Sequence, residues 1–172
     1  MDRHPLVCDT TLLLYLGRIG QTRLLHALFA PICVPEPVQL ELDMGRLLRP
    51  DTINPSQLGW ITSVSVDQGD LDALPPNRLG QGERAVIAYA RFHAGHWAGL
   101  DDQQARLFAE RLGLKVVGII GVLIRAKSAG LIPAVRPPLD ALPAAGFRLA
   151  SELYQEALRL AGEKAGWPEV RN

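Results

Sequence analysis

The sequence predicts a three-layer α/β/α domain with a mainly parallel central sheet. Short apolar segments alternate with helical patterns from residue 6 to residue 130, and such alternation is typical of a parallel sheet covered by helices on both faces. The 172 residues, of which 48% are hydrophobic, suffice for one sizeable core. We expect a single domain over residues 1–162, followed by a frayed tail over residues 163–172.

Five short segments have the composition of strands. Residues 6–8, 32–34, 97–100 and 114–117 are largely apolar, as buried parallel strands are. Residues 61–66 alternate apolar side chains with Thr and Ser, which predicts a half-exposed strand at the edge of the sheet.

Helical patterns separate and follow these strands. Pro37 stands where a first helical turn accepts proline, and Gly113 and Gly130 stand where helices are expected to end. Residues 45–60 are polar and are expected to form a loop or a small insertion. The predicted helices cover residues 12–16, 21–29, 38–44, 83–93, 103–112, 118–129, 139–145 and 152–161.

Four carboxylates fall at positions from which they can meet. Asp9 and Asp101 each follow a predicted parallel strand, and the carboxyl ends of parallel strands share one edge of the sheet. Glu41 and Glu83 lie on the apolar faces of their helices, where an unpaired carboxylate is costly unless a cation neutralises it. Mg²⁺ and Mn²⁺ prefer oxygen ligands of this kind, so the pattern predicts a divalent metal site.

Each acid also has a purely structural interpretation. Asp9 can cap the helix that follows it, and Asp101 with Gln104 forms the pattern of a capping box. Asp102 and Glu83 fall in first helical turns, where acids are favoured by the helix dipole. Caps explain the acids one by one, whereas a metal site explains why they gather at one sheet.

Four segments, taken in order, resemble the motifs of the PIN-domain superfamily. A hydrophobic strand ending in Asp and two hydroxyls is the first, and the acids of the later segments follow in the expected order. The tail, with Gly-Phe-Arg-Leu at residues 146–149, resembles the branch of bacterial and archaeal PIN-like predicted nucleic-acid-binding proteins, and the likeness extends over residues 6–162. The four segments are residues 7–11 (VCDTT), 34–41 (VPEPVQLE), 79–83 (LGQGE) and 100–106 (LDDQQAR).

The resemblance implies a metal-dependent ribonuclease with a PIN-like fold. It implies that Asp9, Glu83 and Asp101 hold one or two Mg²⁺ or Mn²⁺ ions and that Glu41 completes the acidic, catalytic pocket. A metal-activated water then attacks an RNA phosphodiester. Thr10, by hydrogen bonding to a ligand water or a phosphate, and Asp102 are the supporting residues.

The same resemblance implies partners. Relatives of this kind are often toxins of toxin–antitoxin pairs, which form homodimers and are inhibited by a small antitoxin protein. We therefore expect RNA as substrate, a small protein inhibitor and a homodimer, the last also because the helix at residues 21–29 could present an apolar face beyond its own core.

Two other interpretations remain. A non-catalytic PIN-like RNA-binding or regulatory module would keep the acids without turnover, and Leu100 favours it, because many active relatives have Ser or Thr there. A phosphatase of the haloacid-dehalogenase type also has an Asp after its first strand. It needs a second Asp two residues later, where this chain has Thr11.

The charge balance limits how RNA could be bound. Eighteen basic and eighteen acidic residues cancel, so nucleic-acid binding must come from a local patch. Arg106, Arg111, Arg125 and Lys127 are interpreted as solvated helix faces, with a phosphate-binding patch as the alternative. Two cysteines in apolar runs, and no apolar segment long enough to cross a bilayer, indicate a cytoplasmic protein with reduced thiols and no membrane contact.

Overall fold

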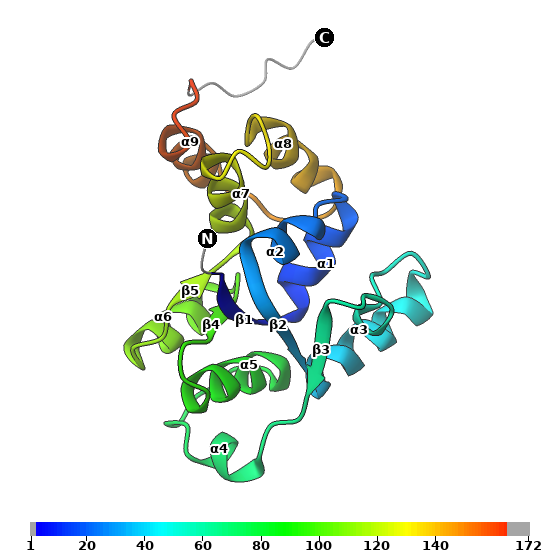
Figure 1. The fold of residues 1–172 in the computed structure, drawn as a ribbon, viewed down its shortest axis with the longest axis vertical. Helices are drawn as coiled ribbons and strands as arrows, with labels where there is room; N and C mark the ends of the chain where they lie inside the picture. The colour runs from blue at the N-terminus through cyan, green and yellow to red at the C-terminus, as the bar shows by residue number, and fades with distance from the viewer. Residues whose placement is uncertain (1–2, 165–172) are drawn as a thin grey trace.

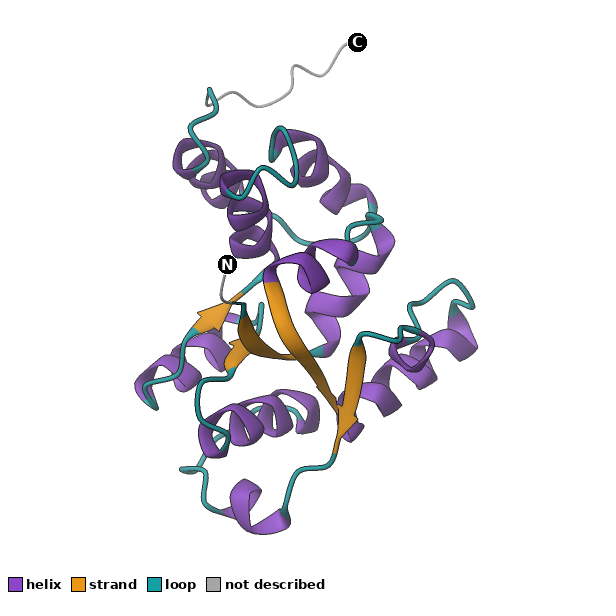
Figure 2. Cartoon of the chain, viewed as in Figure 1, coloured by secondary structure: helices purple, strands orange, loops and turns teal. Residues whose placement is uncertain are grey.

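A computed structural model describes residues 3–164 and has the predicted three-layer α/β architecture (Figures 1 and 2). Within those residues the sheet has five strands, all parallel, in the order β3-β2-β1-β4-β5. The half-exposed strand at residues 61–66 is indeed an edge strand, although it is shorter than predicted. The strands are β1 (His4–Cys8), β2 (Phe29–Pro35), β3 (Ile61–Val64), β4 (Trp97–Gly99) and β5 (Val116–Val117).

The helices follow the predicted order with shifted ends. Phe29, expected in a helix, begins β2 instead, because its side chain is buried in the core at the sheet. The helices are α1 (Thr10–Arg18), α2 (Arg23–Leu28), α3 (Glu36–Leu48), α4 (Gln68–Asp72), α5 (Gln81–Phe92), α6 (Gln103–Arg111), α7 (Ile119–Ser128), α8 (Arg136–Ala144) and α9 (Ser151–Leu160), with a 3₁₀ turn η1 (Pro55–Gln57).

The direction of the chain across the sheet reverses between β1 and β4. From β1 the chain moves to β2 and β3 on one side, and it then returns past β1 to β4 and β5. Figure 1 shows α5 on one face of the sheet, where it contacts β1, β2 and β4, while α1 and α2 lie on the other face with α7. Such a reversal leaves a crevice at the carboxyl ends of the two central strands, which is where open α/β sheets bind ligands.

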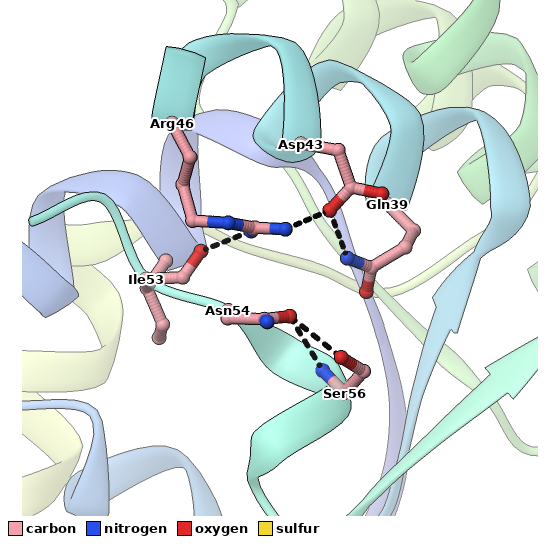
Figure 3. A network of polar contacts seen from close by, with 6 residues as sticks. All are labelled: Gln39, Asp43, Arg46, Ile53, Asn54 and Ser56. Atoms are coloured by element: carbon pink, nitrogen blue, oxygen red, sulfur yellow. Dashed lines mark hydrogen bonds and ion pairs between the residues drawn. The ribbon is translucent and has the colours of Figure 1, made fainter. Parts of the chain in front are cut away.

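Helix α3 is longer than the sequence indicated. It continues through Gly45 to Leu48, where a loop was predicted from residue 45. Figure 3 shows why the last turns hold together: Asp43 accepts hydrogen bonds from Gln39 and Arg46 along the helix, and Arg46 also donates to the carbonyl of Ile53 at 3.2 Å. Contacts between residues three and four apart stabilise a helix, and the bond to Ile53 ties the following loop to it.

The structure also describes α2, the two cysteines and the length of the apolar helices. Leu24 and Leu25 of α2 are buried in the core, and Leu28 is half-buried. Cys8 and Cys33 are buried free thiols. No helix within residues 3–164 is long and apolar enough to cross a membrane.

The carboxyl end of the described chain is docked on the domain. Glu163, which begins the segment expected to be frayed, forms an ion pair of 2.9 Å with Lys127. The same carboxylate accepts hydrogen bonds from the backbone amides of Val135 and Arg136, at the start of α8. Residues 165–172, the rest of that predicted tail, lie outside the described residues.

Candidate active site

Asp9 and Asp101 lie side by side at the carboxyl edge of the sheet, as predicted. Strands β1 and β4 are parallel neighbours, with Cys8 paired with Gly99. The backbone amide of Asp9 donates to the carbonyl of Gly99 at 3.0 Å. Both acids therefore follow the two central strands, β1 and β4, between which the order of the strands reverses.

Asp9 caps a helix and also belongs to a cluster of acids. Its Oδ1 accepts a hydrogen bond of 2.8 Å from the backbone amide of Leu12, which caps α1. The side chain is buried, and burial raises the pKa of this carboxyl well above its ordinary value. The negative charges of Asp101 and Glu83 raise the pKa further, whereas hydrogen bonds from the backbone amides of Leu12 and Asp101 lower it. The structural and the functional interpretation of Asp9 are thus compatible.

Asp101 does not form the expected capping box. Its Oδ1 accepts a hydrogen bond of 2.9 Å from the backbone amide of Ile119, at the start of α7, whereas Asp102 caps α6 through the amide of Ala105 at 2.9 Å. The second oxygen of Asp101, Oδ2, is buried and has no hydrogen-bond partner among the described residues. Burial raises the pKa of Asp101 to about 6, although the amide of Ile119 and the charge of Arg106 lower it.

Glu41 and Glu83 form the opposite wall of a small cavity. Glu41 accepts a hydrogen bond from the hydroxyl of Thr10, and Oε2 of Glu83 accepts one of 3.1 Å from the amide of Gly80. Burial raises the pKa of Glu83; the Gly80 amide opposes this, while the charges of Asp102 and Glu41 add to it. The cavity has a volume of about 200 Å³ and is lined by Asp9, Thr10, Thr11, Glu41, Gly80 and Glu83.

Two glycines, which the sequence analysis did not identify as part of the site, allow the acids to approach the helices. A Cβ at Gly82 would lie 2.7 Å from Oε1 of Glu41, and a Cβ at Gly118 would lie 2.6 Å from Oδ1 of Asp101. Both distances are shorter than a carbon–oxygen contact permits. A glycine at a helix start just after a strand was the available signal in the sequence, and Gly118 fits it.

Arg106 and Lys127 are not the solvated helix residues that were predicted. Arg106 turns back to the sheet edge, where it donates to the carbonyl of Leu100 at 3.0 Å and lowers the pKa of Asp101. Lys127 is paired with Glu163. Arg111 is exposed as expected, and Arg125 lies over the ring of Trp97, 4.5 Å from its centre.

The side chains of this edge suit a divalent ion in chemical type. All are oxygen donors, and Oδ2 of Asp101 is a buried acceptor that a cation would satisfy, so the set fits Mg²⁺ or Mn²⁺ better than a softer metal. Among residues 3–164, however, no three His, Cys, Asp or Glu side chains already converge as a metal-binding group. Each of the four acids directs one oxygen to a backbone amide or a hydroxyl instead.

The raised pKa of Asp101 predicts an unusual pH dependence in the metal-free protein. A carboxyl with a pKa of about 6 when folded and 3.8 in its ordinary state binds more protons when folded, so stability is lost as pH rises from about 4 to about 6. In EDTA, lowering the pH from 7 to 5 should therefore favour the wild type over Asp101→Asn by about 1 kcal/mol in the free energy of urea unfolding. Equal pH dependence in both proteins would contradict the buried, charged state of Asp101.

The parallel sheet, the reversal of strand order between β1 and β4 and the carboxylates at that edge define a three-layer α/β protein with an acidic candidate site. A family profile described as a PIN domain matches residues 5–163, so the chain belongs to the PIN-domain family. The fold is accordingly nuclease-like, and the predicted resemblance is confirmed. No curated protein matches the chain.

Proposed function

We propose that this protein is a metal-dependent ribonuclease that hydrolyses RNA phosphodiesters. PIN domains are generally nucleases and typically depend on divalent metal ions. The observation that carries the proposal is that Asp9, Glu41 and Glu83 line one cavity and that Asp9 lies beside Asp101, whose Oδ2 is buried with no hydrogen-bond partner among residues 3–164. Negatively charged carboxylates that lie close together destabilise the fold unless a cation bound between them neutralises their charge.

Three of the four acids are held by backbone amides, and the fourth, Glu41, is held by a hydroxyl. Asp9 and Asp101 stand on strand ends and are fixed by backbone amides, so in the proposal they hold the ion, with Glu83 as the third ligand. Glu41 is oriented by the Thr10 hydroxyl. A divalent ion bound there would lower the pKa of a water and offset negative charge on the phosphate.

Proton transfer is the second task of the residues. Hydrolysis by water releases a proton, and a carboxylate of the cavity wall that does not hold the ion is suited to accept it. Glu41 meets this condition, since it lines the cavity and is not one of the three proposed ligands. The charge of Asp102 adds to the negative charge beside Glu83, while its own carboxylate caps α6.

The alternative function is a non-catalytic RNA-binding module, and one observation favours it. The residue before Asp101 is Leu100, which has no hydroxyl and whose side chain is completely buried, so it supplies no polar group to the cavity. Such a module would bind RNA through the same edge and would also be stabilised by metal, but it would not cleave.

Cleavage of single-stranded RNA separates the two functions. We expect the purified protein to cut a labelled single-stranded RNA with Mn²⁺ present and to stop when EDTA is added. RNA that is bound but stays intact in Mn²⁺, over a range of sequences, would favour the non-catalytic module. The chain belongs to the PIN-domain family and not to the phosphatases of the haloacid-dehalogenase type.

Partners and location complete the proposal. We place the protein in the cytoplasm as the toxin of a toxin–antitoxin pair, a homodimer held inactive by a small protein. The apolar surface proposed for such partners is on α3, because three large apolar side chains of that helix face solvent. They are Leu40, Met44 and Leu47, with between 63% and 76% of each exposed.

A further inference from the structure

Two further cavities follow the acidic one, each sharing residues with the one before it. The first, of about 190 Å³, shares Thr10 and Glu41 with the acid-lined cavity and is mostly apolar. The second, of about 410 Å³, shares Arg18 and Arg49 with the first. The three cavities therefore adjoin in sequence, from the carboxylates to a pair of arginines.

The walls of this track are helices α1 and α3, which contact each other. Both helices begin at the carboxyl edge of the sheet, after β1 and β2, and both run away from it. One wall presents Thr10, Leu14 and Arg18, four residues apart along α1, and eight residues of helix span about 12 Å. We call this track, with its opposite wall on α3, the α1–α3 groove.

The opposite wall has the same order of chemistry. Along α3 it presents Glu41, then Gly45 and Leu48, then Arg49. A Cβ at Gly45 would meet only Thr52, at 3.8 Å, so the glycine leaves the groove open at its middle. Leu48 is 87% exposed at the rim. Each wall therefore starts at a residue that also lines the acidic cavity, Thr10 or Glu41, continues with a leucine and ends in an arginine.

The loop after α3 contacts both helices that form the walls of the groove. Ile53 packs against Gly17 of α1, where an added Cβ would lie 3.2 Å from the Ile53 Cβ, and its carbonyl accepts the bond from Arg46 of α3. Figure 3 shows this connection beside the turn in which Asn54 accepts hydrogen bonds from Ser56. The loop after α3 thus bridges both walls and fixes their separation.

Arg18 is held in place at the far end of the groove. It donates to the carbonyl of Ala145 at 3.0 Å and lies 5.3 Å from the centre of the Tyr15 ring. The hydrogen bond to Ala145 uses one of the five donors of a guanidinium. Arg49 is exposed on the other wall. The acid beyond them, Asp51, lines the last cavity only.

We propose that the α1–α3 groove binds the backbone of single-stranded RNA on one side of the scissile bond. In this proposal Arg18 and Arg49 bind phosphates about 12 Å from the acids, and Leu14 and Leu48 pack against bases. That length corresponds to about three stacked nucleotides at ~3.4 Å each. This proposal rests on the proposed function, because the groove starts at the carboxylates where cleavage is proposed to occur.

The chemistry of the groove favours RNA over a peptide. Carboxylates at one end would repel a nucleic acid unless cations drew it in, and two arginines at the far end provide that attraction. Apolar surface between charged ends suits bases on a phosphate chain, because stacking and packing of bases accompany backbone contacts in single-stranded binding. A protein segment in the groove is the competing occupant.

Binding of a labelled oligouridylate, several times longer than the groove, tests the proposal. Fluorescence anisotropy in EDTA at a series of salt concentrations measures affinity without cleavage. The double variant Arg18→Gln/Arg49→Gln should bind about 10-fold more weakly at low salt, and each arginine removed should lower the slope of log affinity against log salt by about 0.7. Arg49→Lys should keep the wild-type slope, because a lysine also neutralises a phosphate.

Two controls separate this effect from general loss of charge or of fold. Arg23→Gln/Arg111→Gln removes the same charge from exposed positions outside the groove and should leave binding unchanged. Melting curves show whether Arg18→Gln, which loses its bond to Ala145, is folded; Arg49→Gln alone, with no such bond, should still lower the slope.

The outcomes distinguish the groove from the nuclease. Loss of binding in the groove variants, with a wild type that never cleaves in Mn²⁺, would support the groove and remove the proposed function. Wild-type cleavage with unchanged binding in the double variant would overturn the groove and keep the nuclease. A wild type that does not bind the oligouridylate, or groove variants that lose only self-association, would likewise overturn it, the latter in favour of a protein occupant.

Discussion

Asp9→Asn is expected to abolish RNA cleavage while leaving the metal-free protein as stable as the wild type or more stable. Burial raises the pKa of the Asp9 carboxyl, and the neighbouring charges of Asp101 and Glu83 raise it further, so replacing it by a neutral side chain removes both the cost of a buried charge and the repulsion. Asparagine caps a helix about as well as aspartate, so the bond from the Leu12 amide can be kept. If Asp9 is a metal ligand, the variant loses an oxygen anion that the ion requires.

Melting temperatures with and without Mn²⁺ measure this directly. The wild type should gain stability in proportion to metal occupancy, and Asp9→Asn should lose most of that gain together with at least 100-fold in cleavage, about 2.7 kcal/mol in transition-state stabilisation. Asp67→Asn, at the exposed N-cap of α4, is the matched control and should behave as wild type. An unchanged Mn²⁺ shift in Asp9→Asn would show that Asp9 is a helix cap only.

Local patterns in the sequence were sufficient to place Asp9 and Asp101 together. Each acid follows a short apolar strand, and parallel strands direct their carboxyl ends to one edge, so the two acids meet when their strands are neighbours in one sheet, as β1 and β4 are. The resemblance to the PIN domain supplied the order of the motifs. Helical spacing placed Glu83 on an inner face, where it is partly buried, but the same prediction was wrong for Glu41, which is exposed; both acids nevertheless line the same cavity.

The support of Asp101 could not be predicted in the same way. Its partner, the amide of Ile119, is 18 residues further along the chain, and it arrives only because α7 returns to the edge of the sheet after β5. The capping box with Gln104 was the better local pattern, but the tertiary contact replaced it. The end of α3 was mistaken for a similar reason, since the bond from Arg46 to Ile53 depends on how the loop folds back.

Gly118→Ala is expected to displace Asp101 and to weaken the metal response without unfolding the protein. The backbone of Gly118 is extended (φ −108°), so an alanine is not strained there; the conflict comes from its Cβ. That atom would lie 2.6 Å from Oδ1 of Asp101, 2.7 Å from Nη1 of Arg106 and 3.2 Å from the carbonyl oxygen of Leu100. Two of these neighbours are side-chain ends that can move, so we expect a cost of about 1–3 kcal/mol in the free energy of unfolding.

The consequence for function follows from which atoms move. Asp101 can make room only by giving up its bond to Ile119, and the carboxylate then leaves the position beside Asp9, so the Mn²⁺ melting shift and the cleavage rate should both fall. Gly80→Ala is the matched control: it too changes a glycine at a helix N-cap of the site, but its Cβ would lie 3.8 Å from Glu83, an ordinary contact. If Gly118→Ala lost stability but kept the full Mn²⁺ shift, Asp101 would have a structural role, and the metal would have to be held by Asp9 and the two glutamates.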